Sequence, residues 1–236
     1  MRSDFDPGAV RGAILREGLA LAAHGLLQPF GRASAVPRRR ERRADLRTVV
    51  FVHGLAANRA GFLPMQTWLW ACGHRRQIAL RYRSRGSIEA IALRLKALLD
   101  AEVRGGRIDL VAHSMGGLVA RVYLQMLNGA RRVDRLVTLG TPHFGSHAAS
   151  FIPSALVRQL LPGSSLLRHL NARPAPAGVR TLSVVAGRDL LVQPVESSAC
   201  PFGEVLRFDE LGHLELLFRP QVLARGEAAL HGPVEP

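Results

Sequence analysis

The sequence predicts an α/β fold with a doubly wound, mostly parallel sheet. Short, continuous apolar runs alternate along the chain with segments of helical periodicity, and this order implies right-handed crossovers between parallel strands. The 236 residues, of which 47% are hydrophobic and 21% charged, suit one globular domain with a core of its own. This composition excludes a disordered tail protein and a disulfide-stapled mini-scaffold.

Six strands and their connecting helices follow from these patterns. The run at 48–52 is continuously apolar rather than alternating, as expected of a strand that is buried on both faces. A helix is expected at 87–103, because Ser87 can cap it and apolar residues recur at helical spacing from Ile91 to Leu99. By the same criteria, further strands are expected at 77–82, 107–112, 133–139, 180–186 and 205–208, and helices at 59–72, 115–127 and 214–223.

The chain divides into an extension and a domain. Residues 1–47 are expected to form an amphipathic, basic N-terminal extension whose helix packs on the domain at 48–236. The alternative is an interfacial anchor assisted by the arginine block at 38–43. Within the domain the alternation fails at about 144–178, where prolines break short apolar pieces, and we expect a lid insertion there.

The N-terminus does not resemble a secretory signal. Asp4 and Asp6 lie where a positively charged region should be, and the uncharged stretch at 18–31 is too short to span a bilayer. We therefore expect a cytoplasmic protein, with peripheral contact to an anionic membrane surface as the alternative.

The charge of the chain is strongly positive but dispersed. There are 32 basic and 18 acidic residues, a net charge of +14, and Lys96 is the single lysine. Aromatic residues make up 6% and no base-reading motif accompanies the arginines, so we expect no nucleic-acid partner.

Cys72 and Cys200 lack metal-ligand spacing and are expected to be buried thiols, with a single disulfide as the alternative. No metal or other cofactor is expected.

The motif Ala112-His113-Ser114-Met115-Gly116-Gly117 predicts a nucleophile. It follows the strand expected at 107–112 and opens the next helix, and small residues two before and two after the serine permit a sharp turn. Such a turn exposes the Ser114 hydroxyl at a helix N-terminus. The alternative, a serine that only caps the helix, does not account for this context.

A serine nucleophile requires a base and an acid that orients it. His213, after the last predicted strand, is the expected base, and His231 in the C-terminal tail is the alternative. Asp189, directly after the strand at 180–186, is the expected acid, and it can meet the imidazole from a neighbouring strand end. The competing acids are Glu196, Asp209 and Glu210, whereas Asp109 and Asp134 begin their strands and belong to the opposite edge of the sheet.

Backbone amides are expected to hold the developing oxyanion. One is Met115, which follows the nucleophile, and the other is Leu55 in the loop after the first strand. His53 ends that strand, and we expect it to support the loop beside the substrate rather than act as a base.

Five segments in order resemble the α/β-hydrolase superfamily, and more narrowly its bacterial triacylglycerol lipase and esterase branch. They are His53-Gly54-Leu55, Ala112 to Gly117, Leu139-Gly140-Thr141-Pro142-His143-Phe144-Gly145-Ser146, Gly187-Arg188-Asp189 and Gly212-His213, and the likeness covers residues 48 to about 223. The resemblance implies a serine hydrolase that cleaves carboxylic esters with apolar or lipid-like acyl groups. The structural calcium site of some relatives cannot be placed on this sequence and is not carried over.

The expected substrate pocket lies under the insertion. Its candidate lining residues are His53, Phe144, Phe151, Leu156 and Leu160. An acyltransferase or thioesterase with the same three catalytic residues is the first alternative, and a noncatalytic binding module of the hydrolase fold is the second. The sequence does not specify the acyl-chain length or the oligomeric state.

Overall fold

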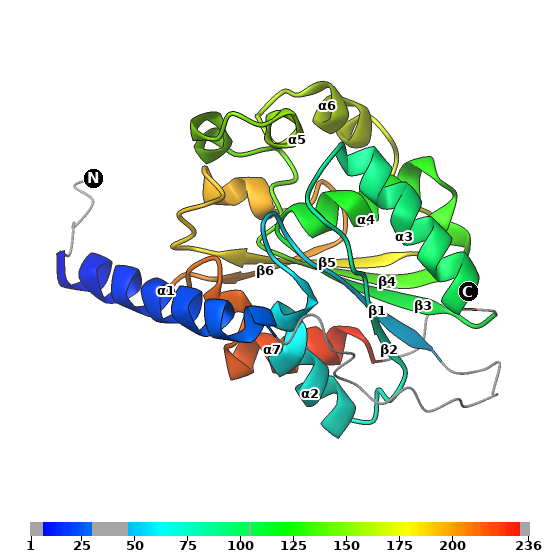
Figure 1. Ribbon diagram of the computed structural model, residues 1–236, viewed down its shortest axis with the longest axis horizontal. Helices are drawn as coiled ribbons and strands as arrows, with labels where there is room; N and C mark the ends of the chain where they lie inside the picture. The colour runs from blue at the N-terminus through cyan, green and yellow to red at the C-terminus, as the bar shows by residue number, and fades with distance from the viewer. Residues whose placement is uncertain (1–6, 30–46, 104, 232–236) are drawn as a thin grey trace.

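Residues 7–29, 47–103 and 105–231 are described by a computed structural model of the chain. A six-stranded, wholly parallel sheet forms its centre, in the order β2-β1-β3-β4-β5-β6 (Figure 1). The strands are β1 (Thr48–Val52), β2 (Gln77–Ala79), β3 (Ile108–His113), β4 (Val133–Leu139), β5 (Arg180–Ala186) and β6 (Glu204–Phe208). The predicted parallel α/β fold is therefore confirmed.

The central strands are buried along their whole length. Every residue of β1, β3 and β4 is buried, which explains why these strands are apolar runs rather than alternating ones. The edge strand β2 is shorter than the predicted 77–82. Its ladder ends where the amide of Leu80 donates to the carbonyl of Phe51, and the following residues leave the sheet.

Helices cover both faces of the sheet. On one face α3 (Ile88–Glu102) and α4 (Met115–Met126) pack over the larger apolar cluster, and on the other α2 (Leu63–Ala71) and α7 (Pro220–Ala229) enclose the second cluster (Figure 1). The oxygen of Ser87 accepts a hydrogen bond from the amide of Ala90 and caps α3 as expected. Short 3-10 turns are η2 (Arg59–Phe62), η3 (Gly129–Arg131) and η5 (Val195–Ser198).

Two local predictions are wrong. The helix expected at 214–223 is instead a 3-10 turn, η6 (Glu215–Leu217), followed by α7, because Pro220 occupies a first-turn position that needs no backbone donor. Cys200 is buried as expected, but Cys72 is exposed at the C-cap of α2, and both thiols are free.

The segment between β4 and β5 contains three short helices. They are η4 (His147–Phe151), α5 (Ala155–Arg158) and α6 (Ser165–Asn171), and they lie beyond α4 at the top of Figure 1. Leu156, Val157 and Leu170 join the apolar cluster beneath α3 and α4, so this insertion is packed onto the domain.

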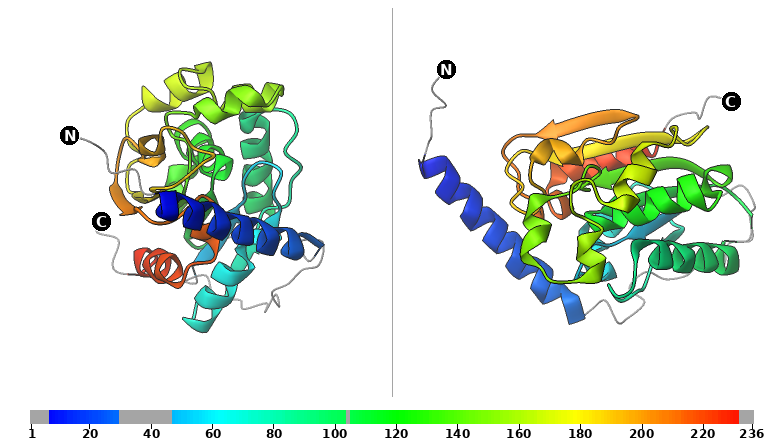
Figure 2. Two further views of the ribbon diagram at one scale, coloured as in Figure 1. Left: turned by 90° about the vertical axis from the view of Figure 1, so that its left-hand side faces the viewer. Right: turned by 90° about the horizontal axis from the view of Figure 1, so that it is seen from above.

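The N-terminal helix α1 (Pro7–Leu27) crosses the edge of the sheet at which the strands end. It contacts η2, which follows β1, and η6, which follows β6, and its first turns extend beyond the body of the molecule (Figure 2). None of the described helices is long and apolar enough to cross a membrane. The arginine block at 38–43 lies outside the described residues.

Candidate active site

Ser114 lies on a strained turn between β3 and α4. Its φ of 55° and ψ of −132° are unusual for a residue other than glycine. The turn needs small neighbours, because a Cβ on Gly116 would overlap the carbonyl of Val52, and one on Gly54 would lie 2.9 Å from the Cβ of Ser114. The hydroxyl of Thr141 donates to the Ser114 carbonyl at 2.9 Å and holds the turn from the end of β4.

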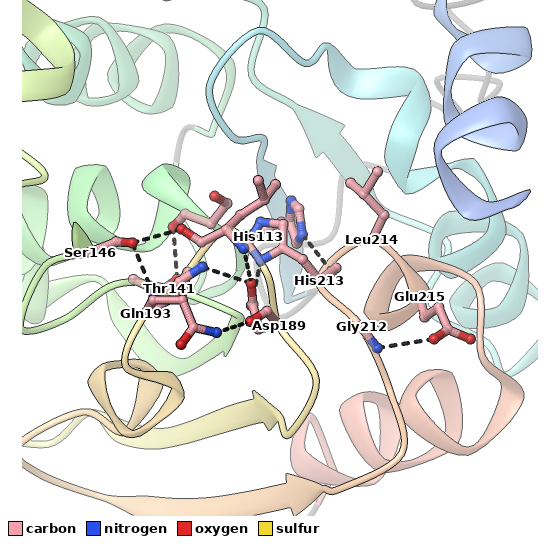
Figure 3. Close-up of polar contacts among 12 residues, drawn as sticks. His113, Thr141, Ser146, Asp189, Gln193, Gly212, His213, Leu214 and Glu215 are labelled. Carbon is pink, nitrogen blue, oxygen red and sulfur yellow. Dashed lines mark hydrogen bonds and ion pairs between the residues drawn. The ribbon is translucent and has the colours of Figure 1, made fainter. Parts of the chain in front are cut away.

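His213 and Asp189 form a buried pair at the same edge of the sheet. The imidazole Nδ1 of His213 lies 2.6 Å from Oδ2 of Asp189, and the side chains are 2% and 0% exposed (Figure 3). The other carboxylate oxygen of Asp189 accepts hydrogen bonds from the amides of Leu191, at 2.8 Å, and Val192, at 2.7 Å. Burial lowers the pKa of His213, but the Asp189 carboxylate, with a smaller contribution from Glu17, raises it, and the pKa lies above its ordinary value.

An apolar cavity of about 270 Å³ brings Ser114 and His213 together. Its walls come from α1, the loop after β1, the insertion and the loop after β5, and they include Leu21, Leu55, Val157, Leu160 and Leu191. Within the described residues no hydrogen bond joins the Ser114 hydroxyl to His213. Contacts of this kind are often long in an unliganded site and shorten around the substrate.

The amides of Leu55 and Met115, the predicted oxyanion donors, both lie beside Ser114. Met115 is the first residue of α4, and Leu55 lines the cavity beside Ser114. In the described part of the chain, neither amide donates to another group. The N-terminus of α4 adds its positive dipole end at the same place.

The competing acids and the competing base lie elsewhere. Glu196 and Asp209 are exposed and pair with Arg207 at 3.3 and 2.5 Å, and Glu210 is exposed as well. His231 pairs with Glu227 just beyond α7. None of the four borders the cavity that holds Ser114 and His213.

The structure brings only one of the five predicted pocket residues into this cavity. Leu160 lines it, whereas Leu156 is part of the core under α3, and Phe144 and Phe151 are 46% and 85% exposed on the insertion. The insertion instead contributes Val157 of α5 to the cavity, together with Leu160 just beyond the end of that helix. His53 is buried and lines a second, polar cavity on the other side of the loop at 54–57.

Sequence reasoning missed two glutamates beside the His213 loop. Oε1 of Glu17, from α1, accepts a hydrogen bond from the amide of Leu214 at 2.7 Å, and Oε2 of Glu215 accepts one from the amide of Gly212 at 3.0 Å (Figure 3 shows the second). Burial raises the pKa of Glu17, against the lowering effect of the Leu214 hydrogen bond and of His213. No motif links a residue of the extension to His213, although Glu17 interrupts the apolar stripe of α1.

The parallel sheet, the strained serine turn and the Asp–His pair at the strand ends define an α/β-hydrolase fold, and the comparisons agree. The family model described as PGAP1-like alpha/beta domain matches residues 88–152. The mature form of Bacillus licheniformis lipase BlEst2 superposes with a TM-score of 0.62 at 17% identity, over 77% of this chain and 90% of that one. None of the curated protein sequences matches this chain.

Two further solved structures extend the likeness. Aspergillus fumigatus lipase B has a TM-score of 0.68 at 15% identity, over 87% of this chain and 58% of that one. Phospholipase PlaB from Legionella pneumophila has a TM-score of 0.54 at 19% identity, over 60% of this chain and 38% of that one. The predicted resemblance is thus confirmed at the level of the α/β-hydrolase fold, and these neighbours are two lipases and a phospholipase.

Proposed function

We propose that this protein is a serine hydrolase that cleaves carboxylic esters with apolar acyl groups. One observation carries the proposal: a buried Asp189–His213 hydrogen bond borders the same apolar cavity as Ser114 on its strained turn. An imidazole that is oriented by a carboxylate, next to a serine at a helix N-terminus, is the arrangement that activates a hydroxyl for acyl transfer.

In the proposed mechanism the Ser114 oxygen attacks the ester carbonyl, and His213 takes the serine proton through Nε2. Asp189 holds the opposite nitrogen and stabilises the imidazolium that forms. The amides of Leu55 and Met115 donate to the oxyanion of the tetrahedral intermediate. His213 then protonates the leaving alcohol, which leaves an acyl-enzyme on Ser114. Water attacks this ester with His213 as base, and the acid product and free Ser114 result.

The lining of the cavity supports an apolar acyl chain as the group bound there. Leucine, valine and isoleucine side chains from α1, η4, α5 and the loop after β5 surround it, and the solved neighbours include two lipases and a phospholipase. Leu15, Leu19 and Leu26 of α1 are more than half exposed and follow one helix face, whereas Leu21 of the same helix lines the cavity. Together with the net charge of +14, they support peripheral contact with an anionic lipid surface.

Hydrolysis of a series of p-nitrophenyl esters, from acetate to palmitate, tests the proposal. We expect Ser114→Ala to lower turnover by about 10⁴-fold or more, because it removes the nucleophile. Ser165→Ala, at an exposed position of α6, is the matched control and should retain wild-type rates. Undiminished turnover by Ser114→Ala would overturn the proposal. Product analysis in the presence of an added alcohol or thiol distinguishes hydrolysis from acyl transfer.

A further inference from the structure

A second cavity lies beside the apolar one and has the opposite character. It encloses about 460 Å³, and four arginines contribute to its lining, in which the described residues include no carboxylate. We call it the arginine pocket and define it by Arg59, Arg81, Arg83 and Arg85, with Gln28 and Asn58. Ala56 and Ala57 line both cavities, so the arginine pocket begins two residues or fewer from the Leu55 amide proposed for the oxyanion.

In the segment after β2, exposed arginines alternate with side chains that attach the segment to the loop after β1. Tyr82 is buried, stacks on the ring of His53 with centroids 4.0 Å apart, and donates its hydroxyl proton to the His53 carbonyl. The oxygen of Ser84 accepts from the amide of Ala56 at 3.2 Å. Tyr82 and Ser84 thus attach the segment to the loop after β1. The arginines on either side of them, Arg81, Arg83 and Arg85, are exposed.

The three exposed arginines are not neutralised locally. Among the described residues, no carboxylate forms an ion pair with Arg81, Arg83 or Arg85. Other arginines of the chain do find such partners: Arg132 lies 2.9 Å from Asp100, and Arg107 pairs with Asp134. Concentrated positive charge in a concave site attracts an anion, and the planar guanidinium group suits a phosphate in particular.

His53 adds a second requirement for the ligand. Its Nδ1 lies 3.0 Å from the carbonyl oxygen of Gly54 and so carries the proton, which leaves Nε2 as an acceptor. The side chain is 3% exposed, and within the described residues Nε2 has no hydrogen-bond partner although the residue lines the arginine pocket. A hydroxyl group of the ligand would satisfy this nitrogen.

We infer that the arginine pocket binds the alcohol portion of the ester, and that this portion carries a phosphate group and a free hydroxyl. The inference rests on the proposed ester hydrolysis at Ser114. The apolar cavity takes the acyl chain, the ester carbonyl lies at Leu55 and Met115, and the leaving alcohol extends past Ala56 and Ala57 to the arginines. The substrate class is therefore acylated polyol phosphates, of which 1-acylglycerol 3-phosphate is the simplest probe.

The test compares 1-acylglycerol 3-phosphate with 1-acylglycerol of the same acyl chain, both below the concentration at which they aggregate. We expect kcat/KM of the wild-type protein to favour the phosphate ester by about 10-fold or more, through KM, with the preference falling as salt is added. Arg81→Gln/Arg83→Gln should bring the ratio of the two kcat/KM values close to one. Arg94→Gln, on an exposed position of α3, should keep the wild-type ratio.

The outcomes separate the inference from the proposed function. Hydrolysis of both esters without preference, or a preference that survives the double substitution, overturns the inference alone. If neither ester is hydrolysed although p-nitrophenyl esters are, the inference alone fails, and if p-nitrophenyl esters are not hydrolysed either, the proposed function fails. If free inorganic phosphate inhibits hydrolysis of the neutral ester while the phosphate ester has no advantage, the pocket takes a free anion and not a substrate group. Calorimetric binding of 1-acylglycerol 3-phosphate to Ser114→Ala, weakened by the double substitution, would support the pocket without relying on turnover.

Discussion

Asp189 and Asp109 are both fully buried aspartates, but they lie at opposite edges of the sheet and have opposite surroundings. Asp189, after β5, accepts hydrogen bonds from two backbone amides and pairs with the His213 imidazole. Asp109, near the start of β3, lies among permanent cations, 3.4 Å from Arg135 and 3.7 Å from Arg47. Burial raises the pKa of Asp109 to about 7, although Arg47 opposes this shift.

This difference shows what distinguishes the proposed proton-handling site from a structural ion cluster. At the strand starts, aspartates meet arginines, which do not give up a proton near neutral pH and so cannot exchange one with them. At the strand ends, the chain leaves the sheet in loops, so Asp189 and His213 can come from different strands and face a cavity. The burial of a carboxylate alone therefore does not indicate catalysis, whereas its pairing with a titratable ring at a cavity does.

The largest effect should come from Asp189→Asn. An amide cannot stabilise the imidazolium or fix its tautomer, so we expect kcat on p-nitrophenyl esters to fall by about 10³- to 10⁴-fold. The acidic limb of the pH profile of kcat/KM should also shift. Because His213 must be neutral to accept a proton, its raised pKa places the wild-type midpoint above that of an ordinary histidine. Removing the carboxylate should shift the midpoint to lower pH. A loss of less than about 10-fold with an unmoved limb would contradict the assignment.

A smaller effect is expected at Glu17. Its carboxylate holds the amide of Leu214, next to His213, and acts on catalysis only through the position of that loop. Glu17→Ala should lower kcat by about 5-fold, the equivalent of one lost hydrogen bond. Glu17→Gln keeps an acceptor and should recover most of the rate. Both variants should lower the pH midpoint slightly, because Glu17 favours protonated His213. Equal rates for all three proteins, with unchanged pH profiles, would show that Glu17 does not position His213.

The smallest effect on activity is expected from Asp109→Asn, which should change kcat/KM by less than about 2-fold. Its effect should be on stability. Because the pKa of Asp109 is higher in the folded than in the unfolded chain, the folded state binds more protons and wild-type stability falls as pH rises from about 4 to about 7. Asparagine removes this dependence. Between pH 5 and pH 8, the Tm of the wild-type protein should fall by about 3 °C more than the Tm of the variant. An identical decrease in Tm in both proteins would contradict the raised pKa of Asp109.

The sequence predicted the parts of the site whose geometry is local. The bounds of β1, β4 and β5 agree with those expected, and β1 and β4 are buried along their whole length. The motif at 112–117 predicts the turn that the structure has at Ser114. Among contacts between distant segments, the pairing of Asp189 with His213 was predicted because both follow strand ends, whereas contacts that depend on how side chains and helices pack were not. Glu17 reaches the loop of His213 across 197 positions of sequence, and the arginine pocket depends on how Tyr82 and Ser84 attach to the loop after β1.

The pocket prediction failed for a related reason. The insertion has apolar side chains in several short pieces, so its composition cannot indicate which of them face the cavity, the core or the solvent. Phe151 is exposed and Leu156 joins the core, while Leu160, only four residues later, lines the cavity. These directions are set by the turns before and after α5 rather than by hydrophobicity.

The central claim is that Ser114 is the nucleophile, activated by His213 and Asp189. Covalent labelling tests it most directly: the protein is treated with a long-chain fluorophosphonate and its peptides are mapped by mass spectrometry. We predict one stoichiometric adduct on Ser114, absent from Ser114→Ala and much slower to form in Asp189→Asn, with wild-type kinetics in Asp109→Asn. An adduct on another residue, or no adduct on a folded protein, would contradict the account.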